Sequence, residues 1–194
     1  RLEVEPWHPR DPLGSVHLWY LIDDIQIVYD LLSNGVRTWG QLKTLGAAGS
    51  TNLVPMKPST FQTVRARAQV LEAYAAAWRR GRGKPVNQEV LKDSGAVSDN
   101  FADEVSELCD RCRGDAEAII ARLEDGEVKR FRSSKIRELQ EYFEQHGYLV
   151  SEEPLTDDEL QTAVLAEVTA EMRDGHIDED AISRMLSRVI DRHS

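Results

Sequence analysis

Apolar residues recur at steps of three and four along most of this chain, and that spacing limits the fold more than any other feature of the sequence. Such steps place apolar side chains on one face of an α-helix. The clearest case is a helix expected over residues 60 to 80. Its buried stripe would consist of Val64, Ala68, Leu71, Ala75 and Trp78. No alternating strand pattern of useful length occurs apart from the short "GYLV", so the sequence predicts an all-α fold of about eight helices.

Glycine, proline and capping residues divide this pattern into separate helices. A first helix is expected over residues 16 to 33 and closed by Gly35, because glycine readily adopts the left-handed conformation found at helix ends. Thr38 and Gln41 then form a capping box for a short helix through Leu45. Beyond residue 80 the sequence predicts a helix-turn-helix outline over 87–108, helices near 115–123 and 133–146, and a final pair of helices.

These elements are expected to form five segments. The opening "EPWHPRDPLG" holds three prolines and predicts an extended arm over residues 1–15, anchored by Trp7. The segments that follow are an N-terminal helical corner at 16–46, a loop or linker at 47–59, a helix-turn-helix-like core at 60–150 and an acidic C-terminal helical pair at 151–194. The chain starts at Arg1 without a signal-peptide pattern, which suggests a processed or partial chain.

Negative charge is concentrated at one end of the chain. The formal net charge is −10, and residues 141–194 alone carry that whole excess, while 1–60 sum to −1 and 61–140 to +1. The C-terminal part is therefore a poor surface for phosphate and a suitable one for a basic partner. The alternative interpretation is that an acidic helical face only keeps the protein in solution.

The middle of the chain has the outline of a DNA-binding motif. A long first helix, "TVRARAQVLEAYAAAWRRG", precedes "VNQEVLKDSG" and "VSDNFADEVSEL", with Gly95, Val97 and Ser98 in the turn. Residues 63–108 thereby resemble the three-helix head of tetracycline-repressor-type regulators, which implies DNA contact by the helix that begins at Ser98. Two features depart from that family: Ala96 lengthens the turn by one residue, and the bulky Leu91 stands where the family usually has a small residue.

A second, shorter resemblance lies near the N-terminus. The stretch "LLSNGVRTWGQL" is similar to the helix–glycine–helix corners of helix-hairpin-helix and related small DNA-binding domains, which present a glycine-flanked turn to phosphate. Here "LGAAG" places Gly46 and Gly49 three residues apart rather than two. A plain helix corner is the alternative interpretation.

The charge of the second helix opposes DNA contact. Between Ser98 and Asp110 it has no Lys or Arg, and Asn100 is its single candidate for reading a base. Its five acids are Asp99, Asp103, Glu104, Glu107 and Asp110. Each acid beside a phosphate costs about 1 kcal/mol in a high dielectric, so several together can cancel the phosphate contacts. Acids in the first turn are also explained by the helix dipole alone.

Basic residues are grouped elsewhere. The candidate nucleic-acid contacts besides Asn100 are Arg65, Arg67, Arg79, Arg80, Arg82 and Lys84. A second group consists of Lys129, Arg130, Arg132, Lys135 and Arg137. Cations at the end of a helix also complement its dipole, and the second group is interleaved with acids, so both groups have a purely structural interpretation.

Metal, cofactor and catalytic signals are weak. Cys109 and Cys112 form a CxxC without the second pair of ligands that a structural zinc site needs, and two cysteines favour a reducing, cytoplasmic setting. We expect no metal, no cofactor and no enzyme activity. Asp23 and Asp24 interrupt the longest apolar stretch, so no membrane span is expected. One of these two carboxylates is expected to be partly buried beside a basic residue such as Arg37 or Arg67.

The sequence thus favours a non-catalytic helical adaptor or assembly subunit, possessing a helix-turn-helix-like middle and docking on another protein chain or on a second copy of itself. The expected contact is a narrow apolar seam on the last helix: Ile182, Met185, Leu186, Val189 and Ile190. The alternative function is a DNA-binding helix-turn-helix regulator that contacts the duplex through residues 61–108 and dimerises through its C-terminal helices.

Overall fold

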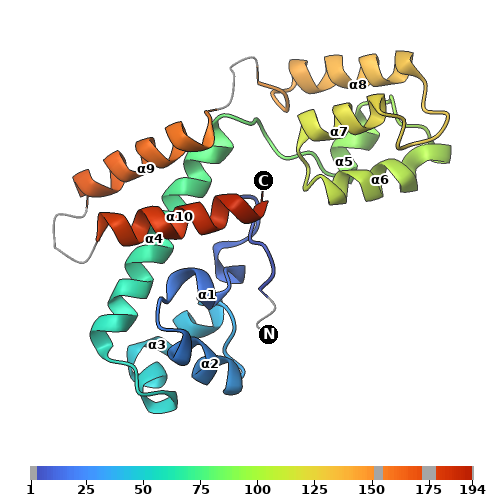
Figure 1. Cartoon of the computed structure of the whole chain (residues 1–194). Helices are drawn as coiled ribbons and strands as arrows, with labels where there is room; N and C mark the ends of the chain where they lie inside the picture. Colours follow the sequence, from blue (N-terminus) through green and yellow to red (C-terminus); the bar gives the residue numbers. More distant parts are fainter. Residues whose placement is uncertain (1–3, 151–154, 172–177, 194) are drawn as a thin grey trace. The chain divides into compact units, whose positions relative to one another are not determined.

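A computed structural model describes residues 4–150, 155–171 and 178–193; for residues 169–171 and 193 it describes the backbone alone. The first residues of the predicted arm and parts of the predicted C-terminal pair lie outside these ranges. The described residues form ten α-helices, two 3-10 helices and a single isolated β-bridge between His17 and Thr38, which confirms the all-α prediction (Figure 1). The chain divides into unit 1, residues 1–78 with 155–194, and unit 2, residues 79–154.

Unit 1 holds both ends of the chain. Its elements are η1 (Leu13–Ser15), α1 (Leu18–Leu21), α2 (Ile25–Ser33), α3 (Trp39–Leu53), α4 (Pro58–Arg80, as far as Trp78), α9 (Asp157–Glu171) and α10 (Glu179–His193). Unit 2 consists of α5 (Gln88–Asp93), η2 (Asp99–Phe101), α6 (Ala102–Arg111), α7 (Ala116–Glu124) and α8 (Ser133–Gln145). The predicted boundary at 47–59 therefore falls inside unit 1, and the predicted 60–150 core is divided between the units.

The helix expected over residues 16–33 is two helices. The α1 helix ends at Leu21, and Asp24 caps α2 by accepting hydrogen bonds from the backbone amides of Gln26 at 2.9 Å and Ile27 at 3.4 Å. Aspartate competes with helical hydrogen bonding in this way, so it begins helices better than it continues them. In the second of the two helices, Ile25 and Tyr29 are 46% and 44% exposed.

The linker expected over residues 47–59 is also mostly helical. The α3 helix begins at the predicted capping box of Thr38 and Gln41 and continues to Leu53. It bends at Gly46, whose φ of 69° lies in the left-handed region, and Ser50 donates a hydrogen bond to the Gly46 carbonyl at 2.6 Å. The glycines and small residues of this stretch accommodate a kink rather than a chain break, so only a short connection leads to α4.

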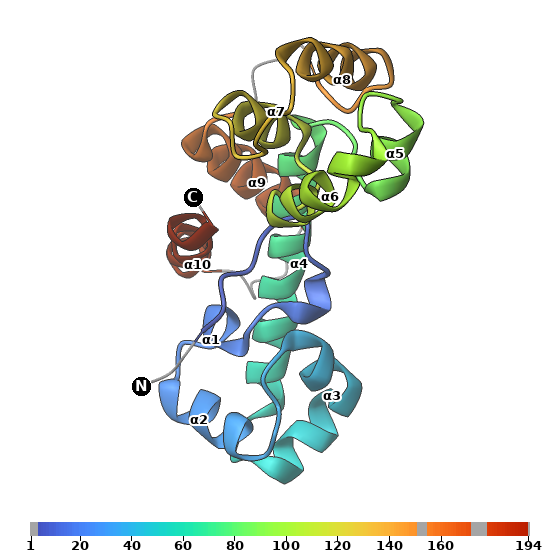
Figure 2. The ribbon, with the colours of Figure 1, turned by 90° about the vertical axis from the view of Figure 1, so that its right-hand side faces the viewer.

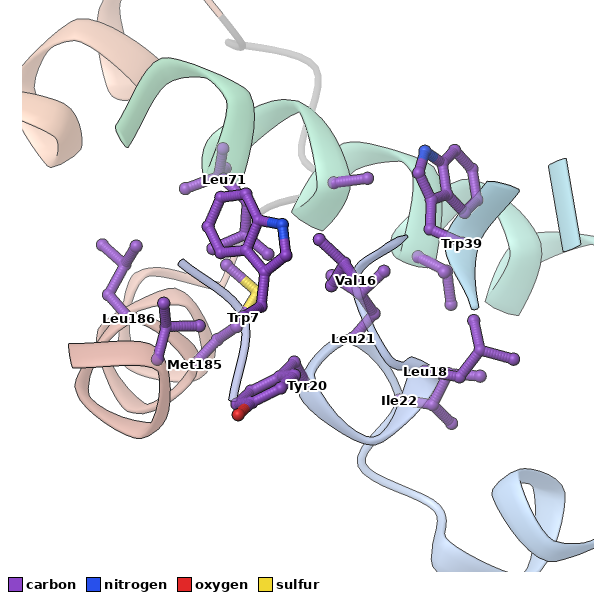
Figure 3. Packing of buried hydrophobic residues seen from close by; sticks show 14 of the residues in the cluster. Trp7, Val16, Leu18, Tyr20, Leu21, Ile22, Trp39, Leu71, Met185 and Leu186 are labelled. Atoms are coloured by element: carbon purple, nitrogen blue, oxygen red, sulfur yellow. The ribbon is translucent and has the colours of Figure 1, made fainter. Parts of the chain in front are cut away.

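The α4 helix forms the centre of unit 1. All five residues of its predicted stripe are at most 3% exposed, which confirms the pattern read from the sequence. Figure 1 shows α10 crossing α4, and in Figure 2 α10 is seen nearly end-on beside α4. Figure 3 shows Trp7 of the N-terminal arm close to Leu71 of α4 and Met185 of α10. Trp7 is 2% exposed and donates a hydrogen bond from Nε1 to the Pro12 carbonyl at 3.3 Å, so it anchors the arm as expected.

The apolar seam of α10 belongs to this same core. Its members, Ile182, Met185, Leu186, Val189 and Ile190, are at most 8% exposed and cluster with residues of the arm, α1 and α4. The prediction that the seam docks on another chain is therefore wrong. The seam does need an apolar partner, but the N-terminal part of the same chain supplies it.

Charged groups join α10 and α4 to the segment after α1. Arg67 donates hydrogen bonds to Asp23 Oδ2 at 2.7 Å and to the Leu21 carbonyl at 3.1 Å. Arg188 approaches the other oxygen of Asp23 at 3.9 Å and lies over the Trp19 ring at 5.3 Å from its centroid. The expected pairing of an aspartate with Arg67 is thus confirmed for Asp23, the carboxylate between the two short helices.

Unit 2 has its own core of buried side chains. The cluster runs from Val86 to Phe143 and takes residues from α5, α6, α7 and α8. Leu108, Ile119 and Phe143 lie at its centre and are fully buried. No side chain of α4 is a member of this cluster in the described part of the chain, because the buried face of α4 is already used in unit 1.

Replacing Leu186 by Ala should destabilise unit 1 by about 2–5 kcal/mol, because the truncation leaves a cavity in a core position. All four tryptophans lie in residues 1–78, so urea unfolding followed by tryptophan fluorescence reports this unit. Ser187→Ala, at the exposed next position, is the control. A variant of unchanged stability but lower molecular mass in solution would show that the seam is intermolecular after all.

Replacing Asp23 by Asn should lower the free energy of unfolding by about 1 kcal/mol at neutral pH, because Arg67 loses a charged acceptor but water screens the pair at the 53% exposed Asp23 side chain. The hydrogen bond from Arg67 lowers the pKa of Asp23 below its ordinary value of 3.8. The contribution of Asp23 is therefore complete above that value and disappears as pH falls through the folded-state pKa. Unfolding curves of the two proteins should converge in acid, whereas a gap independent of pH would exclude this ion pair as the cause.

Candidate interaction surfaces

The helix-turn-helix outline of the sequence corresponds to α5, a turn and α6. Asn87 caps α5 by accepting a hydrogen bond from the Val90 amide at 3.0 Å. Ser94 then closes the helix, since its hydroxyl donates to the Leu91 carbonyl at 2.6 Å and accepts from the Ala96 amide at 3.2 Å. Gly95 follows with a φ of 66°, a left-handed conformation that glycine adopts readily.

The bulky Leu91 is accommodated in the turn region, since its side chain is 3% exposed and lies in the core that α5 and α6 share. One expectation about this turn needs correction. The second helix does not begin at Ser98, which makes no side-chain cap. A 3-10 turn, η2, comes first and carries the exposed Asn100, and α6 begins only at Ala102.

The long helix that the family resemblance places before this motif is α4. Its buried side chains belong to the core of unit 1, whereas α5 and α6 belong to the core of unit 2. The three-helix head that the resemblance implies therefore stays a prediction.

The outward side of α6 is acidic. Val105, Leu108 and Cys109 turn inward and are at most 2% exposed. The exposed carboxylates are Asp103, Glu104, Glu107 and Asp110, which we call the acidic face. Within the described ranges none of the four forms an ion pair or a side-chain hydrogen bond, so their charges are available to a partner.

A shallow hollow lies at one end of this face. It measures about 500 Å³ and is lined by Val86, Asn87, Gln88, Glu89, Asp110, Arg113 and Gly114. Two of its lining residues make a close backbone contact, because the Val86 amide donates to the Gly114 carbonyl at 2.8 Å. Gly114 has a φ of 70°, and a Cβ there would lie 2.4 Å from the Val86 carbonyl oxygen. Only glycine permits this approach.

The first group of predicted nucleic-acid contacts is divided between the two units. Arg67 is 8% exposed and paired with Asp23, so its prediction as a contact is wrong. Arg65 is exposed on α4 in unit 1, whereas Arg79, Arg80, Arg82 and Lys84 belong to unit 2. Lys84 donates a hydrogen bond to the His146 carbonyl at 3.4 Å. Arg79 and Arg80 are exposed, and these two and the half-buried Arg82 have interaction partners of their own.

The second basic group is better placed. Lys129, Arg130, Arg132 and Arg137 are exposed around the start of α8, and Lys135 pairs with Glu138 at 2.6 Å. Of the acids that were expected to interleave with them, Glu127 is paired with Arg111 at 3.2 Å and also with Arg122.

The cysteines are in positions that suit packing. Cys109 is buried and donates from Sγ to the Val86 carbonyl at 3.4 Å, and Cys112 is half-buried. Burial is the main reason that the pKa of the Cys112 thiol lies above its ordinary value, which disfavours the reactive thiolate. Among the described residues there is no group of three His, Cys, Asp or Glu side chains that could hold a metal ion.

Three further acids stand at the starts of helices. Asp24 caps α2, and Asp157 and Asp158 stand in the first turn of α9. No helix in the described ranges is long and apolar enough to cross a membrane.

Comparisons with known proteins give no family for the chain: no family model, no curated protein and no solved structure matches it.

Gly114→Ala should loosen unit 2 far more than Gly95→Ala. Both glycines have φ near 70°, so each substitution carries a backbone penalty of about 1–2 kcal/mol. A Cβ at Gly95 meets open space, whereas one at Gly114 collides with the Val86 carbonyl. Hydrogen exchange of peptides from α5 to α7 measures the difference, because unit 2 contains no tryptophan. Equal effects of the two changes would mean that the Val86 contact is dispensable.

Proposed function

We propose that the protein is a non-catalytic helical adaptor or assembly subunit that acts through protein–protein contacts. The observation that carries the proposal is the acidic face of α6: four exposed carboxylates without ion-pair partners in the described residues, on the helix that a helix-turn-helix protein would offer to DNA. Since the seam of α10 is buried, the adaptor is proposed to use this face in its place.

The charge of the face determines the kind of partner it fits. Asp103, Glu107 and Asp110 follow one another at steps of four and three, so their charges line one side of α6 over two turns. A phosphate backbone would be repelled by about 1 kcal/mol for each close acid in a high dielectric. A basic protein surface would be attracted, and its approach would be accelerated by the same field.

The geometry around α6 suits a rigid docking element. Gln88 donates a hydrogen bond to Ser106 at 2.6 Å, and this bond joins α5 to the side of α6. Val105, Leu108 and Cys109 fix the opposite side in the core. A partner therefore meets charges whose helix is already ordered, which reduces the entropy lost on binding.

The setting of the adaptor follows from weaker observations. Two free cysteines, one buried and one with a raised pKa, support a reducing, cytoplasmic location. The helix-turn-helix-like form of α5 and α6 supports a place in a complex that handles nucleic acid.

The alternative proposal, a DNA-binding regulator, keeps one favourable observation: Asn100 is exposed in the turn before α6. The dimer through the C-terminal helices that it requires is disfavoured, because the apolar side of α10 already packs within unit 1.

The test compares two variants that remove the same charge. Asp103→Asn, Glu104→Gln and Glu107→Gln together remove most of the acidic face, and Glu117→Gln, Glu124→Gln and Glu141→Gln remove three exposed acids elsewhere in unit 2. Partners captured by the whole chain are identified and purified, and their affinities are measured by calorimetry. We expect the acidic-face variant to lose about tenfold or more in affinity and the control to keep it.

Two outcomes would overturn the adaptor. One is equal loss of affinity in both variants, because binding would then depend on the total charge of the protein and not on the acidic face. The other is sequence-dependent binding of duplex DNA that disappears on Asn100→Ala, since that result would assign α6 to base reading.

A further inference from the structure

A dense run of positive charge surrounds the start of α8. Ten consecutive residues, from Val128 to Arg137, hold five cations and no carboxylate, in a chain whose net charge is −10. Lys135 is paired with Glu138, and the other four are exposed. We call these four the basic surface: Lys129, Arg130, Arg132 and Arg137.

The cations of the basic surface are not neutralised by the protein itself. In the part of the chain that the structure describes, none of the four side chains forms an ion pair or a hydrogen bond. The carboxylates closest in sequence are occupied, since Glu127 binds Arg111 and Arg122 and Glu138 binds Lys135. The surface therefore presents four net positive charges to solvent.

Apolar anchors hold this surface in place. Val128 and Ile136 are 3% and 6% exposed, and Phe131 packs edge-on against Phe101 with ring centroids 5.4 Å apart. The cations alternate with these anchors and lie on the solvent side. The segment is thus ordered before any ligand arrives, unlike a flexible basic tail.

The N-terminus of α8 adds to the positive potential. Arg132 occupies the N-cap and makes no capping side-chain hydrogen bond, and the first turn contains no acid. The helices α2, α5 and α7 begin instead with an Asp or Asn side chain that accepts an amide hydrogen bond. The exposed amides and the helix dipole reinforce the cations, although the cations alone carry the inference.

We propose that the basic surface binds the phosphate backbone of duplex DNA without reading its sequence. Exposed Arg and Lys side chains are the groups that contact phosphates, and they specify no base. A duplex is favoured over a single strand because the only aromatic ring of the segment, Phe131, packs against Phe101 and is not free to stack on bases. This binding is independent of the acidic face, so one unit would hold a basic protein and DNA at separate surfaces.

The experiment measures fluorescence anisotropy of a labelled duplex of mixed sequence with the whole chain at several salt concentrations. Four phosphate contacts predict a slope of about −3.6 for the logarithm of the binding constant against the logarithm of salt concentration. Each single change, such as Arg130→Ala, should reduce the slope by about 0.9. The combined variant K129A/R130A/R132A/R137A should lose the salt-dependent binding.

A matched control removes the same charge elsewhere. K43A/K57A/K92A/R184A replaces four exposed cations outside the basic surface and should bind within about twofold of the wild type. All eight positions are exposed, and far-ultraviolet circular dichroism confirms that both variants fold. Neutralising the acidic face should leave DNA binding intact or strengthen it, so failure of the adaptor proposal is separable from failure of this one.

Three results would overturn the proposal. They are the absence of duplex binding at low salt, equal loss in the control variant, and tighter binding of a single strand than of the duplex.

Discussion

The apolar side of α10 is the constraint on which the rest of the architecture depends. Ile182, Met185, Leu186, Val189 and Ile190 must leave water, and the chain covers them with residues of the arm, α1 and α4 that lie more than a hundred positions earlier. Burying a large aliphatic side chain contributes about 1.5–3 kcal/mol, so this stripe alone is a strong reason for the two ends of the chain to associate. The segment between them, residues 79–154, is thereby an insertion with a separate core.

Local signals in the sequence predict the helices well, but they predict poorly where helices break and which segments pack against them. The stripe of α4, the capping box at Thr38 and the glycine at 35 depend on contacts within a few residues, and all three are confirmed. The break at Asp24 and the kink at Gly46 were interpreted wrongly, because an aspartate or a glycine can end a helix or merely redirect it. What covers α10 could not be predicted, since periodicity shows that a face is buried but not which distant segment buries it.

For the candidate sites, too, the sequence shows the residues but not their contacts. The acids of α6 and the cations around α8 were visible as charges, but their availability depends on pairing that spans the fold. Arg67 reads in the sequence like any other cation of its group, and only the structure shows it buried against Asp23. The sequence suggests that acids neutralise the basic group near α8. In the structure Glu127 pairs with Arg111 and Arg122, and Glu138 pairs with Lys135, so the other four cations of the group have no acid partner among the described residues.

Opposite charges that stay unpaired within one small unit need an explanation. The acidic face begins at Asp103, two residues after Phe101, and Phe101 packs against Phe131 of the basic segment, so this aromatic contact joins the two segments while their charges stay unpaired. Surface ion pairs contribute only about 0–1 kcal/mol, and leaving these charges unpaired therefore costs the fold little. Separate fields of opposite sign can instead be used outside the molecule, where each attracts one kind of partner and rejects the other. Keeping them apart is what would allow a protein and a nucleic acid to be held without competing for the same surface.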